Sequence, residues 1–310
     1  MDGAMTGASS AAEASSLHRY RTVDVPVRGG ELRVGVWDVP DADAPTVVLV
    51  HGITSSHLAW QFVVDALPGV RVIAPDLRGR GGSNGLAGPA GMRSHADDLE
   101  AVFASLDIAP TLVVGHSMGA FVSVAFAHLY PARVTRLLLI DGGLPLAAPE
   151  GLTTDELVAA ILGPTAARLS LRFADAGAYL DFWRAHPAFA SDWSPELERY
   201  LAYDLVRDGD AYRPATSYET TADDTVDLNT GTLMPEALAA LRHPAALVTV
   251  PRGLQNEEPG LYPVDHLAAL LAAYPAVGHS RWEGYNHYTV IMSASGGAAV
   301  ADLIRRELSA

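Results

Sequence analysis

The sequence predicts an α/β protein whose doubly wound, mostly parallel sheet is interrupted by a helical insertion. Strand-like apolar segments alternate with helical segments through the first 145 residues, and the same alternation returns after about residue 239. Between these two parts the strand signals disappear. The chain has 310 residues, of which 49% are hydrophobic, and this is enough for one large core that carries an insertion.

The first part of the sheet is predicted from two kinds of strand pattern. Residues Leu32–Val39 alternate between apolar and polar, which is typical of an antiparallel strand, whereas the continuous apolar run Thr46–Val50 is typical of a buried strand. Residues Ser56–Leu67 have helical spacing and begin at a serine that can cap a helix. The elements expected next are strands at Arg71–Ala74, Thr111–Val114 and Val134–Ile140, and helices at Met92–Leu106 and Ser117–Tyr130.

The domain organisation follows from where the alternation stops. Residues 146–238 look helical and loop-like, so we expect a lid over the carboxyl edge of the sheet, where open α/β sheets place their sites. Residues 17–145 and 239–310 form the expected core domain, and residues 1–16, which lack the pattern of a signal peptide, form an expected flexible leader. The elements expected after the insertion are strands at Ala246–Val250 and Gly278–Trp282, and helices at Pro263–Tyr274 and Gly297–Leu308.

Composition excludes several classes of chemistry and partner. The absence of Cys excludes disulfides and cysteine nucleophiles, and the absence of Lys excludes a lysine Schiff base. The net charge of −15 argues against nucleic acid and anionic membranes as partners, because binding to phosphates needs a basic surface. No apolar run approaches the roughly 18–20 residues that span a bilayer. We expect a cytoplasmic protein.

The pentapeptide Gly115-His116-Ser117-Met118-Gly119 is the strongest functional signal in the chain. It follows a predicted buried strand and precedes a predicted helix, which is the setting that a G-x-S-x-G nucleophile elbow requires. The two glycines leave room for a strained turn at the serine. A serine that only caps a helix is common, but it does not need both glycines. Ser117 is therefore the predicted nucleophile.

An oxyanion hole is expected beside this serine. A tetrahedral intermediate needs two preorganised N–H donors. One is the N–H of Met118, the residue after the nucleophile, and the other comes from the loop His51-Gly52-Ile53 after the strand Thr46–Val50, where Ile53 is the expected donor. We expect His51 itself to pack or to form hydrogen bonds.

These motifs resemble those of the α/β-hydrolase superfamily, in its lid-bearing esterase and lactonase branch. The resemblance covers roughly Val23 to Leu308. It is carried by His51-Gly52, by the turn Asp76-Leu77-Arg78-Gly79-Arg80-Gly81, by the Gly115–Gly119 elbow and by Asn286-His287. The resemblance implies a serine nucleophile with a histidine base and no metal or organic cofactor.

The base is predicted from chain order. In the superfamily the histidine comes last, after the final strand. His287, the last histidine in the chain, lies between the strand expected at Gly278–Trp282 and the last helix. His279 lies within that strand and is a poorer candidate.

The acid is the least determined member of the predicted triad. The usual place for it is the loop after the strand Ala246–Val250, but Asn256 stands where an aspartate would fall. Glu257 and Glu258 are alternatives in this loop. Asp141, at the carboxyl end of the strand Val134–Ile140, is the preferred candidate, and a minority of the superfamily is similar in placing its acid there.

The predicted activity is hydrolysis of a carboxylic ester or lactone through an acyl-enzyme. The aromatic residues of the insertion indicate a small-molecule substrate with an apolar, fairly bulky group. The same triad also supports C–C bond hydrolysis of a diketone-like compound or a cofactor-free peroxidation side reaction. A non-catalytic ligand receptor on this fold is the alternative from another class, although such proteins often lose the serine or the histidine.

Overall fold

The computed structural model describes residues 18–147 and 151–310. The leader expected at residues 1–16 lies outside the described residues. Within the described ranges, no helix has both the length and the apolar character needed to cross a bilayer.

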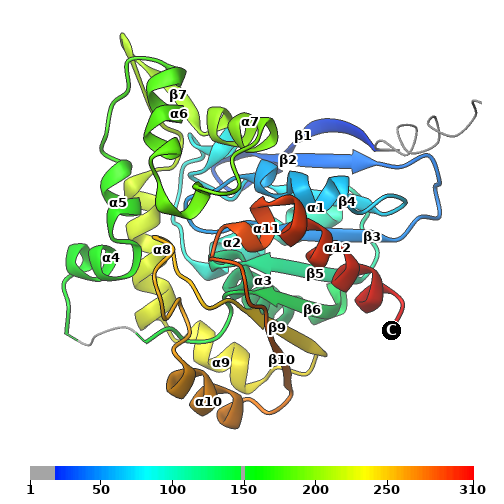
Figure 1. Cartoon of the computed structure of the whole chain (residues 1–310). Helices are drawn as coiled ribbons and strands as arrows, with labels where there is room; N and C mark the ends of the chain where they lie inside the picture. The colour runs from blue at the N-terminus through cyan, green and yellow to red at the C-terminus, as the bar shows by residue number, and fades with distance from the viewer. Residues whose placement is uncertain (1–17, 148–150) are drawn as a thin grey trace, which may run out of the picture.

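An eight-stranded sheet forms the centre of the molecule (Figure 1). Its strand order is β1-β2-β4-β3-β5-β6-β9-β10. The pairs β1·β2 and β2·β4 are antiparallel and all the other pairs are parallel, which confirms the mostly parallel sheet. The strand bounds are β1 Arg19–Val27, β2 Gly30–Asp38, β3 Thr46–Val50, β4 Arg71–Pro75, β5 Thr111–His116, β6 Val134–Ile140, β9 Ala245–Thr249 and β10 Val277–Arg281.

Helices cover both faces of the sheet, and the sheet separates two hydrophobic cores. One core contains the apolar sides of α2 (Met92–Ser105), α3 (Met118–Leu129) and α10 (Val264–Ala273). The other contains those of α1 (Gln61–Asp65), α11 (Thr289–Met292) and α12 (Ala294–Leu308). Strands β3, β5 and β6 contribute side chains to both cores, so they are buried on both faces, as their continuous apolar sequences predict.

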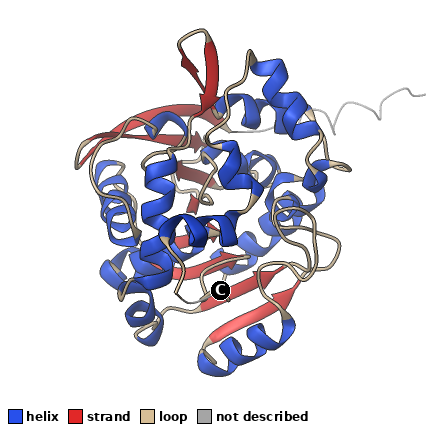
Figure 2. Cartoon of the chain, turned by 90° about the vertical axis from the view of Figure 1, so that its left-hand side faces the viewer, coloured by secondary structure: helices blue, strands red, loops and turns tan. Residues whose placement is uncertain are grey.

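A long segment is inserted between β6 and β9 and lies at the left of Figure 1. It contains a short antiparallel hairpin, which projects from the molecule in Figure 2, where the sequence had predicted only helices and loops. The last helix of the segment, α9, packs against α3 of the sheet domain. The element bounds are α4 Thr154–Leu162, α5 Pro164–Arg168, α6 Ala176–Arg184, α7 Pro195–Tyr203, β7 Leu205–Asp208, β8 Ala211–Pro214, α8 Tyr218–Thr230 and α9 Leu233–Ala239.

Four helices of this segment begin at a polar residue whose side chain accepts a hydrogen bond from the first turn. Thr153 forms a reciprocal capping box with Glu156 at the start of α4. Asp175, Ser194 and Ser217 cap α6, α7 and α8, and each side chain accepts a hydrogen bond from the backbone N–H three residues further on. Each cap satisfies a backbone N–H that has no acceptor within the helix, and so fixes where the helix starts.

Candidate active site

Ser117 lies at a sharp turn between β5 and α3, and its backbone has φ = 55° and ψ = −126°. This conformation is strained for a residue with a side chain, and close packing on both sides maintains it. A Cβ atom on Gly115 would lie 2.3 Å from the carbonyl oxygen of Gly119, and one on Gly119 would lie 2.1 Å from that of Val50. Both glycines are therefore required by backbone contact.

The Ser117 hydroxyl does not cap α3, because its side chain makes no capping hydrogen bond. The turn is instead fixed by the Ser117 N–H, which donates to the carbonyl of Ile140 over 2.9 Å. Met118 is the first residue of α3, so its N–H has no acceptor within the helix. The helix N-terminus also favours negative charge at this position.

The loop after β3 approaches Ser117 closely. A Cβ atom on Gly52 would lie 3.1 Å from Ser117 Cβ and 3.6 Å from Ser117 Oγ. Met118 lines the same pocket as Ser117, and so does Ile53. Both residues expected to supply oxyanion donors thus line the same pocket as the expected nucleophile.

His51 fixes the orientation of this loop. Its Nε2 accepts a hydrogen bond from Leu77 N–H over 2.9 Å, so its Nδ1 carries the proton and donates to the carbonyl of Gly52 over 2.7 Å. Burial lowers the pKa of His51 to about 4, which keeps the ring neutral. The Gly52 carbonyl belongs to the same peptide unit as the Ile53 N–H, so the histidine orients that N–H.

The structure brings His287 and Asp141 together. His287 follows β10 in a loop before α11, and its Nδ1 lies 2.7 Å from Asp141 Oδ2. Both side chains are buried. The other carboxylate oxygen of Asp141 accepts a hydrogen bond from Val250 N–H over 3.3 Å. Donation from His287 Nδ1 to the carboxylate leaves Nε2 as the basic nitrogen of the ring.

The other candidate acids do not contact His287 among the described residues. Asn256 accepts a hydrogen bond from the side chain of Asn286 over 3.2 Å, and Glu257 accepts one from Gln255 N–H over 2.6 Å. Glu258 is exposed beside Arg252.

His279, the rejected base, lies within β10 and contacts the Thr249 hydroxyl over 2.9 Å. It does not line the pocket that contains Ser117.

His116 is a second histidine beside the site, and its contact with His287 was not predicted from the sequence. Its ring centroid lies 4.7 Å from that of His287, and its Nε2 donates to the backbone carbonyl of His287 over 2.8 Å. Burial, with a smaller contribution from nearby His287, holds the pKa of His116 well below its usual range. The neutral ring supports the His287 loop without placing a positive charge there.

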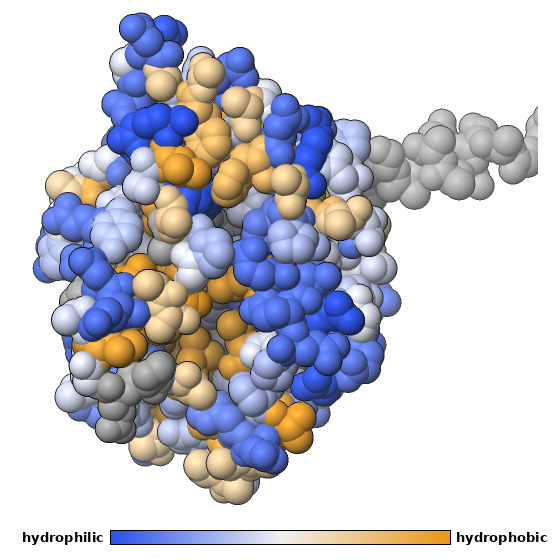
Figure 3. Space-filling view, turned by 60° about the vertical axis from the view of Figure 1, so that its left-hand side comes forward, coloured by the Kyte–Doolittle hydropathy of each residue, from blue (hydrophilic) through white to orange (hydrophobic). Residues whose placement is uncertain are grey.

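Ser117 and His287 open into one pocket, which contains about 720 Å³ of empty space including its mouth. The sheet domain and the inserted segment both supply its walls. Figure 3 shows apolar side chains around a hollow on this side of the molecule. The apolar lining residues include Phe121, Leu146, Ile161, Leu228, Leu254 and Met292.

Two buried hydroxyls interrupt this apolar wall. Thr165 and Tyr288 both line the pocket, and beyond each other their hydroxyls have no hydrogen-bond partner among the residues that the structure describes. Burial raises the pKa of Tyr288, so its hydroxyl stays protonated. Sequence reasoning did not find either residue, although the position of Tyr288 directly after His287 was the available signal.

The residues described also contain no cluster of three or more His, Cys, Asp or Glu side chains arranged to hold a metal ion.

The sequence resembles that of known hydrolases over part of its length. The sequence profile of the alpha/beta hydrolase fold family matches residues 45–169. The chain is 34% identical over 116 residues to Lipase LipV of Mycobacterium tuberculosis, covering 37% of this chain and 43% of the relative. It is 38% identical over 130 residues to an Escherichia coli 2-hydroxy-6-oxononadienedioate/2-hydroxy-6-oxononatrienedioate hydrolase, covering 40% and 44%. The chain spans less than half the length of the curated relatives it matches.

Solved structures match over nearly the whole chain. E-2-(Acetamidomethylene)succinate Hydrolase superposes with a TM-score of 0.74 at 20% identity, covering 94% of this chain and all of the other. Carboxylesterase CesB from Bacillus subtilis superposes with a TM-score of 0.65 at 17% identity, covering 94% of this chain and 92% of the other. At these identities the likeness concerns the fold.

Proposed function

We propose that this chain, which has the α/β-hydrolase fold, is a serine hydrolase that cleaves carboxylic esters or lactones. Ser117 is the proposed nucleophile, His287 the base and Asp141 the acid. One observation carries the proposal: the imidazole of His287 is hydrogen-bonded to a buried carboxylate and opens into the same pocket as a strained serine at a helix N-terminus.

The proposed reaction has two steps. His287 Nε2 removes the proton of Ser117 Oγ as that oxygen attacks the substrate carbonyl, and the Ile53 and Met118 N–H groups stabilise the resulting oxyanion. The protonated His287 then gives its proton to the leaving alcohol. Water, deprotonated by the same histidine, attacks the acyl-enzyme and releases the acid together with free Ser117.

The pocket supports an apolar substrate of moderate size. Its wall is mainly aliphatic and aromatic, and this favours burial of a hydrocarbon acyl or alcohol group. Thr165 and Tyr288, whose hydroxyls have no partner beyond each other, add hydrogen-bonding capacity to that wall. We therefore propose an apolar ester or lactone that carries a neutral polar group.

Replacement of Ser117 by Ala tests the nucleophile. The variant should fold as the wild type does and lose ester and lactone turnover, because no other group would carry the acyl intermediate. A panel of p-nitrophenyl esters and lactones, measured by absorbance or pH-stat, gives the rates. Full activity in the variant would exclude the proposed mechanism.

Covalent labelling separates an enzyme from a non-catalytic receptor. A serine-directed phosphonate should form an adduct on Ser117, located by peptide mass spectrometry, and His287→Gln should slow its formation. An unlabelled wild-type serine would favour a receptor.

The same panel should include a diketone-like compound, because one similar protein is named a hydrolase of a 2-hydroxy-6-oxo acid. Faster turnover of that compound than of every ester would redirect the proposal to C–C bond hydrolysis.

A further inference from the structure

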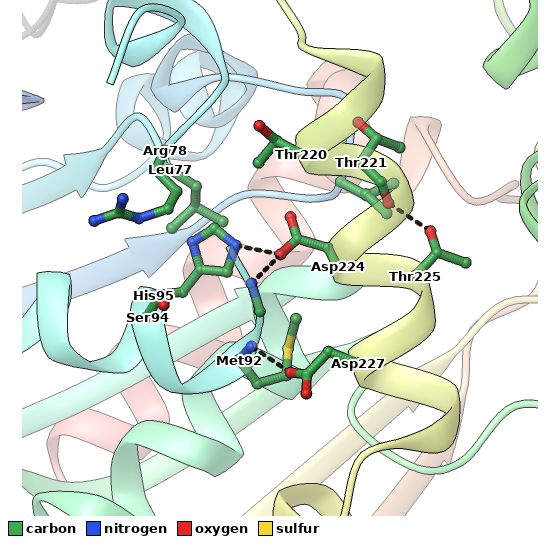
Figure 4. Close-up of polar contacts among 12 residues, drawn as sticks. Leu77, Arg78, Met92, Ser94, His95, Thr220, Thr221, Asp224, Thr225 and Asp227 are labelled. Atoms are coloured by element: carbon green, nitrogen blue, oxygen red, sulfur yellow. Dashed lines mark hydrogen bonds and ion pairs between the residues drawn. The ribbon is translucent and has the colours of Figure 1, made fainter. Parts of the chain in front are cut away.

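Asp224 forms a buried contact between helix α8 of the inserted segment and the sheet domain. Its Oδ1 accepts hydrogen bonds from Gly91 N–H over 2.7 Å and from His95 Nε2 over 2.9 Å, at the start of α2 (Figure 4). Its Oδ2 lies 2.5 Å from a guanidinium nitrogen of Arg80. The side chains of Asp224, His95 and Arg80 are fully buried.

Arg80 connects this carboxylate to the loop of the expected oxyanion hole. It lies in the Asp76–Gly81 turn after β4, a motif to which the proposed chemistry gives no role. Its Nε donates to the carbonyl of Ile53 over 2.7 Å, and its Nη1 donates to the carbonyl of Arg78 over 2.8 Å. The same guanidinium thus forms an ion pair with α8, through a contact without hydrogen-bond geometry, and donates a hydrogen bond to the loop that carries the Ile53 N–H.

We propose that Arg80 and Asp224 are positioning residues that couple the seating of α8 to the geometry of the oxyanion hole. This inference rests on the proposed function, because it assigns a role to the Ile53 N–H. The guanidinium is planar and rigid, so the attraction of the Asp224 carboxylate to its Nη1 also restrains the direction in which its Nε points. Displacement of α8 would therefore release the Ile53 loop.

The strength of this coupling comes from burial. When one member of a buried ion pair is removed, the other is left as an uncompensated buried charge, which strongly destabilises the fold. Although burial itself raises the pKa of Asp224, His95 and Arg80 lower that pKa below its ordinary range. The carboxylate is therefore ionised at neutral pH. The contact is a permanent connection between the two parts of the chain.

Asp227 offers a matched control on the same helix. Its carboxylate also bonds to the start of α2, by accepting a hydrogen bond from Met92 N–H over 2.7 Å (Figure 4). Its described contacts do not include Arg80. Asp227→Asn therefore removes a carboxylate from the same helix, keeps an acceptor for Met92 N–H, and leaves the guanidinium that bonds to the Ile53 loop unchanged.

The test compares Asp224→Asn with Asp227→Asn in the full chain. Asp224→Asn should lower kcat by about 10- to 100-fold with little change in KM, because a displacement of about 1 Å at a reacting group costs roughly this much. The affinity for a trifluoromethyl ketone, which forms an oxyanion on Ser117, should fall in parallel. Asp227→Asn should change neither quantity. Equal losses in both variants would show that the contact only docks the helix.

A double variant protects the test against simple misfolding. Arg80→Met with Asp224→Asn removes both buried charges but keeps an amide oxygen for Gly91 and His95. It should unfold cooperatively, because no unpaired charge is left buried, and still show the low kcat. Recovery of wild-type kcat in this variant would overturn the inference.

Hydrogen exchange supplies a readout that does not depend on turnover. Amide exchange in peptides covering residues 50–56 should accelerate in Asp224→Asn and stay at the wild-type rate in Asp227→Asn. If the loop exchanges equally in all three proteins, the positioning role is wrong. If the loop loosens in Asp224→Asn but wild-type Ser117 takes no phosphonate, the coupling stands and the proposed chemistry fails.

Discussion

At the scale of single residues, the position of Asp141 explains the unusual Asn256. Asp141 adopts a positive φ of 45° directly after β6, and this directs its carboxylate across the neighbouring strand β9. There it meets both Val250 N–H and the His287 ring. Asn256, in the loop after β9, holds Asn286 in place instead. The loop after β9 thus has a structural role without supplying a carboxylate to the histidine.

Replacement of Asp141 by Asn tests this assignment. An amide cannot stabilise the imidazolium ion and can hold the ring in the wrong tautomer, so we expect kcat to fall by about 10³-fold or more. Steady-state kinetics on the best ester of the panel measures the effect. The controls Glu257→Gln and Glu258→Gln should keep wild-type rates. A large loss in either control, with Asp141→Asn active, would move the acid to the other loop.

At the scale of secondary-structure elements, the elbow depends on the close approach of α3 to the end of β3. Gly119 sits in the first turn of the helix, and its missing side chain leaves room for the backbone carbonyls of Val50 and His51. This contact brings Ser117 next to the loop of Gly52 and Ile53. The packing of two elements therefore determines the distance between Ser117 and the proposed oxyanion donors.

Gly119→Ala should destabilise the protein strongly. Its Cβ would lie 2.1 Å from the Val50 oxygen, so the helix must shift, and we expect a loss of about 3 kcal/mol in the free energy of unfolding. Urea denaturation followed by circular dichroism measures it.

Gly278→Ala in β10 is the control, because its nearest contact would be an ordinary 3.6 Å. It should leave stability almost unchanged. Similar stabilities for the two alanine variants would contradict the packing argument.

The sequence was sufficient to predict the elements that are buried on both sides, because their apolar runs are long and unambiguous. The strands β3, β5 and β6 and the residues that directly follow them were placed in this way. Chain order then located His287 after the last strand. The mostly parallel sheet and the α/β-hydrolase fold are confirmed.

Other features could not be predicted because their signals are weak or non-local. Strand β1 is largely exposed, so its sequence lacks a clear apolar pattern, and the hairpin strands have only four residues each. The Arg80–Asp224 pair joins positions far apart in the chain, and no local spacing indicates such a partner. Likewise, only the folded structure distinguishes Asp141 from Glu257 as the carboxylate beside His287.

At the scale of the whole molecule, several buried titratable groups are held in one charge state by their surroundings. His51 and His116 are both neutral in the folded protein, since burial lowers the pKa of each ring. Asp76 remains ionised, with a pKa of about 2, because His57 and His51 offset the effect of burial. The folded protein therefore takes up fewer protons than the unfolded chain when the pH falls below neutrality.

Stability should accordingly fall on acidification. A histidine in the unfolded chain titrates near 6.5. Below this pH the unfolded state therefore binds protons at His51 and His116 that the folded state does not bind. Each group contributes a slope of about 1.4 kcal/mol per pH unit, and for His51 the window extends from 6.5 down to about 4. Chemical denaturation at pH 7.5, 6.5, 5.5 and 4.5 measures the free energy of unfolding.

The variant His116→Gln provides the comparison for this effect. Glutamine can donate to the His287 carbonyl but cannot take up a proton. The slope of the free energy of unfolding below pH 6.5 should therefore decrease by the contribution of one titrating group. A free energy of unfolding that does not vary from pH 7.5 to 4.5 would refute the prediction.

The exposed tip of the β7–β8 hairpin, at Gly209, suggests a use of the molecule as a split reporter. A side chain at this glycine would meet no atom within 4 Å, so the backbone can be interrupted there without loss of packing. One fragment would then carry Ser117 and Asp141, and the other would carry His287. Neither half would contain the complete proposed triad, so the proposed ester cleavage would return only when the fragments, fused to two interacting proteins, reassembled.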